Sequence, residues 1–260
     1  MSAAAELLPV AVEAAEVAGP LLQERFKHPR RGVRAKSTPT DLVSEADHAA
    51  EAAIRALLAE RRPGDGVLAE EGGESAGTTG VRWVVDPLDG TINFLFGIPH
   101  WCISAACEDG DGALAGAIYD PLRGETFAAA RGGGATLGGE PVSGSERAEL
   151  ATAMVATGFA YDAHVRARQA EVAARLVPRV RDLRRMGSAA LDLAWTACGR
   201  FDAFYEQGLQ PWDRAAGALV CAEAGLALCE LPARDGMPAG LLAGPPGLIE
   251  ALAEGLGTSA

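Results

Sequence analysis

The chain has 260 residues, 48% of them hydrophobic, and 35 acidic residues against 23 basic ones give a net charge of −12. This charge disfavours non-specific binding to nucleic acid or anionic lipid. The sequence contains no run of about 18 apolar residues that would span a membrane, and its first residues lack the basic start of a signal peptide. We therefore expect a globular cytoplasmic protein of one domain or a tightly joined pair.

The cysteines and histidines exclude several kinds of site. The five cysteines lie in apolar segments and form neither CxxC pairs nor a zinc-binding Cys/His pattern. They are typical of buried free thiols in a reducing cytoplasm. The four histidines are scattered, and none accompanies a G-x-S-x-G motif or a cysteine nucleophile. Triad chemistry therefore has no support.

The first half of the chain predicts helices followed by strands. Apolar residues at helical spacing indicate a helix over residues 3–27, which Pro20 kinks or divides. A second helix is expected from Ser44 to Arg61, with Ser44 and Asp47 arranged like a capping box. Residues 72–80 form a Gly/Ser/Thr stretch typical of a mobile loop. Strands are predicted at residues 66–72, 83–85, 101–108, 113–119, 127–130 and 135–137.

The second half alternates strands and helices. Strands are predicted at residues 154–157, 180–183, 203–205 and 227–230, and helices at 164–176, 189–198, 214–224 and 246–254. This alternation favours a layered α/β architecture. We expect residues 1–146 to form a metal-binding half, with two helices on a mostly antiparallel sheet. Residues 147–260 then form a half that carries substrate contacts, and the two make one compact catalytic unit.

Two carboxylates mark the end of one predicted strand. The apolar residues 83–85 lead into Asp86 and Asp89, which are followed by Gly90 and Thr91. Pro87 has no N–H and interrupts a regular ladder, so the chain turns here. Carboxylates this close repel each other, and Mg²⁺ prefers such hard oxygen ligands. By itself the motif favours a turn capped by aspartates over a metal site.

Other segments also place carboxylates at the edges of apolar elements. Asp41 and Asp47 lie on either side of the apolar pair at residues 42–43. Glu70 and Glu71 follow the apolar residues 67–69, and Asp213 follows Trp212. Each alone is most simply a cap, a turn or a solvated charge. Their joint occurrence predicts one acidic site.

Six segments resemble the inositol monophosphatase family, in the correct order over nearly the whole chain. Residues 86–94 resemble its first signature and residues 212–218 its second. Residues 36–47 resemble the K-x-x-x-x-D-L-V-T-x-x-D segment, and residues 68–71 the G-E-E segment. Residues 187–190 and 205–206 resemble the substrate-contact G-[ST]-A-A and Y-E. The resemblance implies an alternating α-β-α-β-α sandwich of the inositol monophosphatase / fructose-1,6-bisphosphatase type.

The resemblance also implies a set of metal ligands. Glu70, Asp86 and the backbone carbonyl of Leu88 correspond to the ligands of one Mg²⁺. Asp86, Asp89 and Asp213 correspond to those of a second, and a third, weaker ion uses Glu70 and waters. Such a pair of ions activates water and neutralises the phosphate and the leaving oxygen.

The remaining implied roles concern water and substrate. Thr91, backed by Asp47, orients the attacking water together with Glu70. The N–H groups of Gly90 and Thr91 bind phosphate if a helix starts there. The implied contacts to substrate hydroxyls and the leaving oxygen are Gly187, Ser188, Ala189, Glu206 and Asp213.

The implied activity is Mg²⁺-dependent hydrolysis of a small phosphate monoester, with myo-inositol 1-phosphate favoured. Histidinol phosphate, fructose 1,6-bisphosphate and adenosine 3′,5′-bisphosphate remain open, as does an accessory binding role in transcription machinery. A homodimer and inhibition by lithium follow from the resemblance only. Ala69, Ser44 and Ile92 depart from the family pattern, and none of them removes a proposed ligand.

Overall fold

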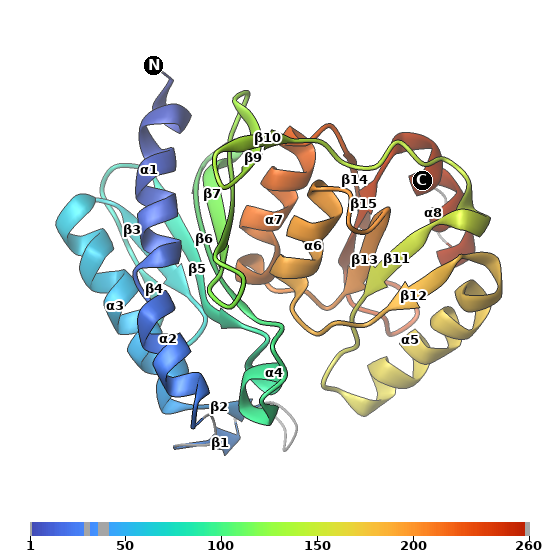
Figure 1. The fold of residues 1–260 in the computed structure, drawn as a ribbon, viewed down its shortest axis with the longest axis horizontal. Helices are drawn as coiled ribbons and strands as arrows, with labels where there is room; N and C mark the ends of the chain where they lie inside the picture. Colours follow the sequence, from blue (N-terminus) through green and yellow to red (C-terminus); the bar gives the residue numbers. More distant parts are fainter. Residues whose placement is uncertain (1, 29–31, 36–41, 258–260) are drawn as a thin grey trace.

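The computed structural model of the chain describes residues 2–28, 32–35 and 42–257. Lys36 and Asp41, two positions of the resemblance, lie outside these ranges. The described elements form five layers, helix–sheet–helix–sheet–helix (Figure 1). The predicted alternating sandwich is thereby confirmed. The helices, layer by layer, are α1 (Ala3–Glu16), α2 (Gly19–Phe26) and α3 (Glu45–Arg61); α6 (Ala189–Ala197) and α7 (Pro211–Glu223); α5 (Ala163–Leu176) and α8 (Pro246–Leu256).

The first sheet has eight strands in the order β10-β9-β8-β7-β6-β5-β3-β4. All neighbours are antiparallel except β3 and β5, which run parallel. The stretch 72–80, predicted to be a loop throughout, contributes the edge strand β4. The strands are β3 (Gly66–Ala69), β4 (Gly73–Ser75), β5 (Arg82–Asp89), β6 (Cys102–Asp109), β7 (Gly112–Asp120), β8 (Glu125–Ala130), β9 (Gly134–Leu137) and β10 (Glu140–Val142).

The second sheet has the order β12-β11-β13-β15-β14. β11 runs parallel to both neighbours, and β15 runs antiparallel to β13 and β14. The strand predicted at 180–183 begins two residues later, and neither β15 nor β10 was predicted. The strands are β11 (Met154–Thr157), β12 (Asp182–Arg184), β13 (Ala203–Gln207), β14 (Ala227–Leu231) and β15 (Gly240–Gly244). The short elements are β1 (Arg34–Ala35), β2 (Leu42–Val43), α4 (Thr91–Phe96) and the 3₁₀ turns Leu150–Thr152 and Val177–Arg179.

Three apolar cores fill the spaces between the layers. The first packs α1–α3 on the first sheet, the second surrounds α6 and α7, and the third lies under α5 and α8. The two central helices approach very closely, since a Cβ built on Gly217 of α7 would lie 2.6 Å from Leu193 Cβ of α6. The two helices form the layer between the sheets (Figure 1).

Local sequence signals explain the helix boundaries near the site. α1 ends at Glu16 and α2 begins at Gly19, so Pro20 divides the predicted first helix rather than kinking it. Ser44 Oγ accepts from the Ala46 N–H at 3.1 Å, and Asp47 Oδ2 accepts from the Ser44 N–H at 2.9 Å. The predicted capping box is therefore confirmed, with aspartate in the place of glutamate.

The remaining predictions on composition can also be compared with the structure. All five cysteines are unpaired, and Cys102, Cys107 and Cys221 are buried. Within the described ranges, no helix combines the length and apolar character needed to cross a membrane.

Candidate active site

The motif at residues 86–91 lies where β5 leaves the first sheet. β5 pairs with β6 up to Asp86, and the register shifts between Asp86 and Asp89. Pro87 lies within this break, since it has no N–H to offer the ladder. Asp86 Oδ1 accepts a hydrogen bond from the Leu88 N–H at 3.0 Å, so the turn folds around this carboxylate.

Gly90 makes the transition from strand to helix. Its φ is 94°, and a Cβ at this position would lie 3.0 Å from the His100 carbonyl oxygen and 3.1 Å from Trp101 Cβ. Both the conformation and the close approach favour glycine. Because α4 begins at Thr91, the helix start required for phosphate binding by the Gly90 and Thr91 N–H groups is present.

Asp47 and Thr91 form a buried pair behind the turn. Asp47 Oδ1 lies 2.9 Å from Thr91 Oγ1, and the Leu88 carbonyl oxygen also lies 2.9 Å from that hydroxyl. The other carboxylate oxygen of Asp47 accepts from the hydroxyl of Ser44 at 2.7 Å. A hydroxyl has only one proton, so donation to Asp47 leaves Thr91 with lone pairs for a second partner.

Asp89 connects the first sheet to α6. Its Oδ2 accepts from Ser188 Oγ and from the Ala190 N–H, both at 2.7 Å. These donors lie at the N-terminus of α6, where backbone N–H groups and the helix dipole favour a carboxylate. The hydroxyl of Ser188 is therefore engaged with Asp89.

The second half supplies Asp213 and Glu206. Asp213 lies in the first turn of α7, which begins at Pro211 rather than at the predicted residue 214, and its Oδ2 accepts from the Gln210 N–H at 2.7 Å. Glu206 lies near the end of β13, directly against Gly158. A Cβ on Gly158 would be only 2.0 Å from Glu206 Oε1.

One cavity of about 510 Å³ brings most of the predicted site residues together. Asp47 is the exception, because it lies behind the wall and reaches the site through Thr91. The predicted residues that line the cavity are Glu70, Asp86, Leu88, Asp89, Gly90, Thr91, Gly187, Ser188, Ala189, Glu206 and Asp213.

Burial and mutual repulsion dominate the electrostatics of this cavity. Burial raises the pKa of Asp86 well above its usual range, and the charges of Glu70, Asp89 and Asp213 raise it further. Burial also raises the pKa of Asp89, although its hydrogen bonds from Ser188 and Ala190 oppose the shift. The pKa of Asp213 is likewise raised well above normal by burial and by neighbouring carboxylates.

Glu206 is subject to the same influences at the other end of the cavity. Its pKa rises to about 8, first because of burial and then because of the charge of Asp192, while Arg185 opposes the rise. Among the described residues that line the cavity, Arg185 alone carries a positive charge. The site therefore has an excess of buried negative charge.

The donor set fits Mg²⁺, which takes carboxylate and carbonyl oxygens and offsets repulsion among them. In the part of the chain that the structure describes, no three His, Cys, Asp or Glu side chains are grouped to hold an ion as they stand. Each of Asp86, Asp89 and Asp213 has one oxygen held by a protein donor. Binding an ion would thus require the other carboxylate oxygens to draw together.

Several residues at the site were not predicted from the sequence. Arg185 and Gly158 line the cavity, and no local signal marked either one. Asn93 belongs to the recognised signature, but its role depends on distant partners. Its Nδ2 donates to the carbonyl of His100 at 2.8 Å and to that of Met186 at 2.7 Å. It therefore fastens α4 to the segment that leads into Gly187.

Comparisons with known proteins show the family to which this layered fold and acidic cavity belong. The sequence profile of the Inositol monophosphatase family matches residues 3–257. The inositol-1-monophosphatase SuhB of Mycobacterium tuberculosis is 46% identical over 230 residues, which are 85% of this chain and 79% of the relative. The Nus factor SuhB of Escherichia coli is 38% identical over 250 residues, 95% of this chain and 94% of the relative.

Solved structures agree with the sequence comparisons. The extragenic suppressor protein suhB from Bartonella henselae has a TM-score of 0.89 at 36% identity, covering 95% of this chain and 97% of its own. Mycobacterium tuberculosis SuhB has a TM-score of 0.83 at 38% identity, covering 97% and 96%. The chain belongs to the inositol monophosphatase family.

The buried repulsion leads to a prediction about stability. Asp86→Asn removes one negative charge but keeps an oxygen that accepts from the Leu88 N–H. In EDTA, we expect urea titration to show a free energy of unfolding about 1 kcal/mol higher than that of the wild type. Mg²⁺ should stabilise the wild type far more than the variant.

The matched control is Asp111→Asn, at an exposed turn residue far from the cavity. This variant should follow the wild type in both media. A destabilised Asp86→Asn protein that is still fully stabilised by Mg²⁺ would contradict the assignment of Asp86 as a ligand of the ion.

Proposed function

We propose that the chain hydrolyses a small phosphate monoester in this cavity with the help of Mg²⁺, and that myo-inositol 1-phosphate is the substrate. The observation that carries the proposal is the arrangement of carboxylates from both sheets around one cavity. Glu70 and Asp86 come from the first sheet, and Asp213 and Glu206 from the second half. We also propose that the halves 1–146 and 147–260 act as one catalytic unit, because each supplies part of this wall.

The proposed ion ligands are Glu70, Asp86, the carbonyl of Leu88, Asp89 and Asp213. Two or three bound Mg²⁺ ions would supply the positive charge that neutralises the phosphate and the leaving oxygen, and would acidify a water. The hydrogen bonds from Leu88, Ser188, Ala190 and Gln210 hold the Asp86, Asp89 and Asp213 carboxylates in orientation before any ion arrives.

Thr91 orients the attacking water in this proposal. Its hydroxyl lies 2.9 Å from Asp47 Oδ1, and donation to that carboxylate leaves the hydroxyl oxygen able to accept a hydrogen bond from the water. Glu70 holds the same water from the cavity wall and takes its proton. The water oxygen then attacks phosphorus in line, and the bond from phosphorus to the ester oxygen breaks on the side of Asp213. The leaving oxygen takes a proton from solvent water, Glu70 returns its proton to solvent, and the products are a free alcohol and inorganic phosphate.

The substrate contacts divide into a phosphate end and a hydroxyl end. At the phosphate end, the N–H groups of Gly90 and Thr91, which lie at the start of α4, donate to the phosphate oxygens. At the other end, Glu206 binds ring hydroxyls, and Gly187 and Ala189 contact the ring through their backbone. A buried carboxylate selects polyols, because a substrate without hydroxyls leaves it unpaired.

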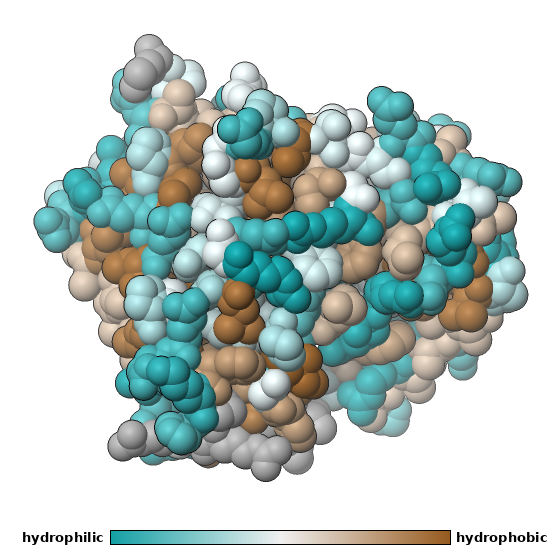
Figure 2. Space-filling model, viewed as in Figure 1, coloured by the Kyte–Doolittle hydropathy of each residue, from teal (hydrophilic) through white to brown (hydrophobic). Residues whose placement is uncertain are grey.

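The family resemblance supports three further proposals, namely a homodimer, a cytoplasmic location and inhibition by lithium. The unpaired cysteines agree with a reducing compartment. Figure 2 shows apolar surface gathered around α4, where Phe96 is 61% exposed and Ile98 is 47% exposed. An apolar surface of this kind suits contact with a second copy.

The second candidate function is an accessory role in transcription machinery. The name Nus factor of the Escherichia coli relative suggests it. The net charge of −12 disfavours direct, non-specific contact with RNA. The acidic cavity favours the phosphatase as the main function.

A substrate panel tests the proposed function. Phosphate release should be measured with Mg²⁺ and with EDTA on four esters: myo-inositol 1-phosphate, histidinol phosphate, fructose 1,6-bisphosphate and adenosine 3′,5′-bisphosphate. We expect turnover only with Mg²⁺, inhibition by Li⁺, and the highest kcat/KM for myo-inositol 1-phosphate. If another ester has the higher kcat/KM by orders of magnitude, the inositol assignment fails. If no ester is hydrolysed, the phosphatase proposal fails and the accessory role gains support.

The contact between Gly158 and Glu206 gives a sharper prediction. Gly158→Ala places a methyl group 2.0 Å from Glu206 Oε1, so the carboxylate must move while the backbone keeps its conformation. We expect KM for myo-inositol 1-phosphate to rise about tenfold, with a smaller change in kcat. The KM for 4-nitrophenyl phosphate, which has no ring hydroxyls, should stay the same.

Gly110→Ala is the matched control, because nothing lies within 4 Å of a Cβ at that turn position. An equal rise in KM for both esters in the Gly158→Ala enzyme would show that Glu206 does not bind the ring hydroxyls.

A further inference from the structure

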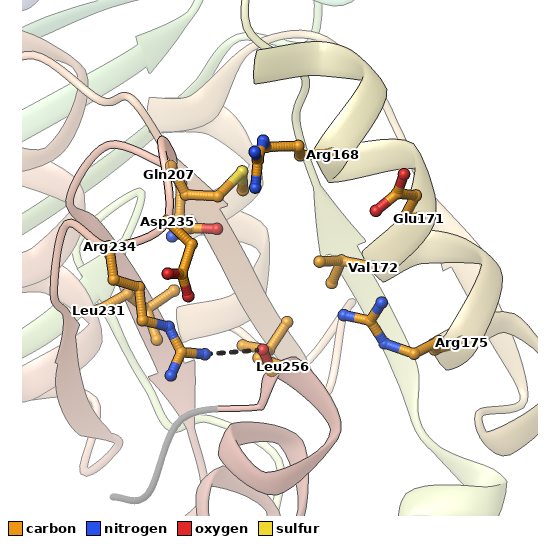
Figure 3. Close-up of a pocket in the computed structure, with 10 residues that line it drawn as sticks. Arg168, Glu171, Val172, Arg175, Gln207, Leu231, Arg234, Asp235 and Leu256 are labelled. Carbon is orange, nitrogen blue, oxygen red and sulfur yellow. Dashed lines mark hydrogen bonds between the residues drawn. The ribbon is translucent and has the colours of Figure 1, made fainter. Parts of the chain in front are cut away.

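A second cavity, of about 170 Å³, opens between α5, the turn that joins β14 to β15, and the end of α8. Arg168, Glu171, Val172 and Arg175 are spaced as neighbours on one face of α5. Figure 3 shows Arg168 and Arg175 reaching from this helix toward the turn. The other lining residues are Gln207, Leu231, Arg234, Asp235, Met237 and Leu256.

Many arginines of the described chain pair with carboxylates, whereas those of this cavity, like Arg166 and Arg181 outside it, do not. Arg200 and Arg123, for example, pair with carboxylates at 2.5 and 2.6 Å. Across the described residues, by contrast, no ion pair involves Arg168, Arg175 or Arg234.

The guanidinium group of Arg234 donates instead to the Leu256 carbonyl at 3.1 Å, as the dashed line in Figure 3 marks. Glu171 and Asp235 line the same cavity without pairing with these arginines within 4.0 Å. The cavity is thus lined by three exposed arginines and two exposed carboxylates, and its lining carries a net positive charge.

This chemistry selects an oxyanion. Planar guanidinium groups match the oxygens of phosphate, and several of them bind it more strongly than neutral donors do. Three arginines against two carboxylates leave net positive charge in a protein whose total charge is −12. We propose that this cavity is a second anion-binding site, which takes a phosphate group, either free or esterified to a small molecule.

The proposed site is connected to the catalytic cavity. Gln207 lines both cavities. On α5, Gln169 follows Arg168 and is buried. Its Oε1 accepts from the Ala160 N–H at 2.7 Å and its Nε2 donates to the Gln207 carbonyl at 3.1 Å. Because Ala160 also lines the catalytic cavity, two hydrogen bonds join the arginine-bearing helix to that wall. The binding proposal itself does not depend on the proposed activity.

Isothermal titration calorimetry with inorganic phosphate tests the site on the full chain in EDTA, which removes divalent ions from the catalytic cavity. Arg175→Gln and Arg234→Gln should each weaken binding about tenfold or more. Glu171→Gln should strengthen it about threefold, because it removes a repelling charge. Arg175→Lys, which keeps the charge, should lose less than Arg175→Gln.

Two controls separate this site from other sources of phosphate affinity. Arg181→Gln changes an exposed arginine outside the cavity, and Arg185→Gln changes the arginine of the catalytic cavity. Neither should weaken the binding. Repeating the titration with glycerol phosphate distinguishes the ligand source: tighter binding of the ester assigns a phosphorylated small molecule, and tighter binding of phosphate assigns the free ion.

Three results would overturn the proposal. These are a wild type that binds neither probe, equal affinity in the wild type and both Gln variants of Arg175 and Arg234, or loss of binding in Arg185→Gln alone. The last result would place the anion in the catalytic cavity.

Discussion

Buried negative charge is the constraint on which the rest of this structure depends. Asp86, Asp89 and Asp213 line one cavity, and burial raises the pKa of each. Carboxylates in such surroundings destabilise a fold unless hydrogen bonds or a cation compensate them. The protein supplies the hydrogen bonds from Leu88, Ser188, Ala190 and Gln210. The proposed ions would supply the rest, so that the carboxylates that destabilise the fold would also hold the ions needed for the proposed hydrolysis.

Asp89 and Asn93 join the first sheet and α4 to the segment that begins α6. Asp89 from the first sheet is bonded to the start of α6, and Asn93 is bonded to the carbonyl of Met186. These partners are 99, 101 and 93 residues apart in the chain. The cavity therefore forms only when both sheets pack on the central helices. We expect a change at this junction to affect both the stability and the proposed activity.

Short-range sequence patterns correctly predicted two features of the site, the helix cap and the break in the strand. The capping box of Ser44 and Asp47 and the interrupted ladder at Pro87 each depend on residues a few positions apart, so the sequence contains the information. The order of the family motifs then predicted the layered fold. The contact of Gly158 with Glu206 could not be predicted in this way, because it follows from the pairing of β11 with β13.

The missed strands have a similar cause. β15 is a short run of Gly, Leu and Ala without β-branched residues, and it becomes a strand by pairing with β13 and β14 on either side. β4 lies in a Gly/Ser/Thr stretch whose composition is typical of a loop, yet it pairs with β3 at the edge of the first sheet. In both places tertiary pairing outweighs local preference.

Anomalous diffraction from crystals grown with Mn²⁺ in place of Mg²⁺ tests the central claim most directly. Strong anomalous peaks are expected inside the cavity, between Asp86 and Glu70 and between Asp86, Asp89 and Asp213, with these carboxylates drawn together around them. Peaks found only elsewhere on this acidic protein, with the cavity carboxylates unmoved, would contradict it.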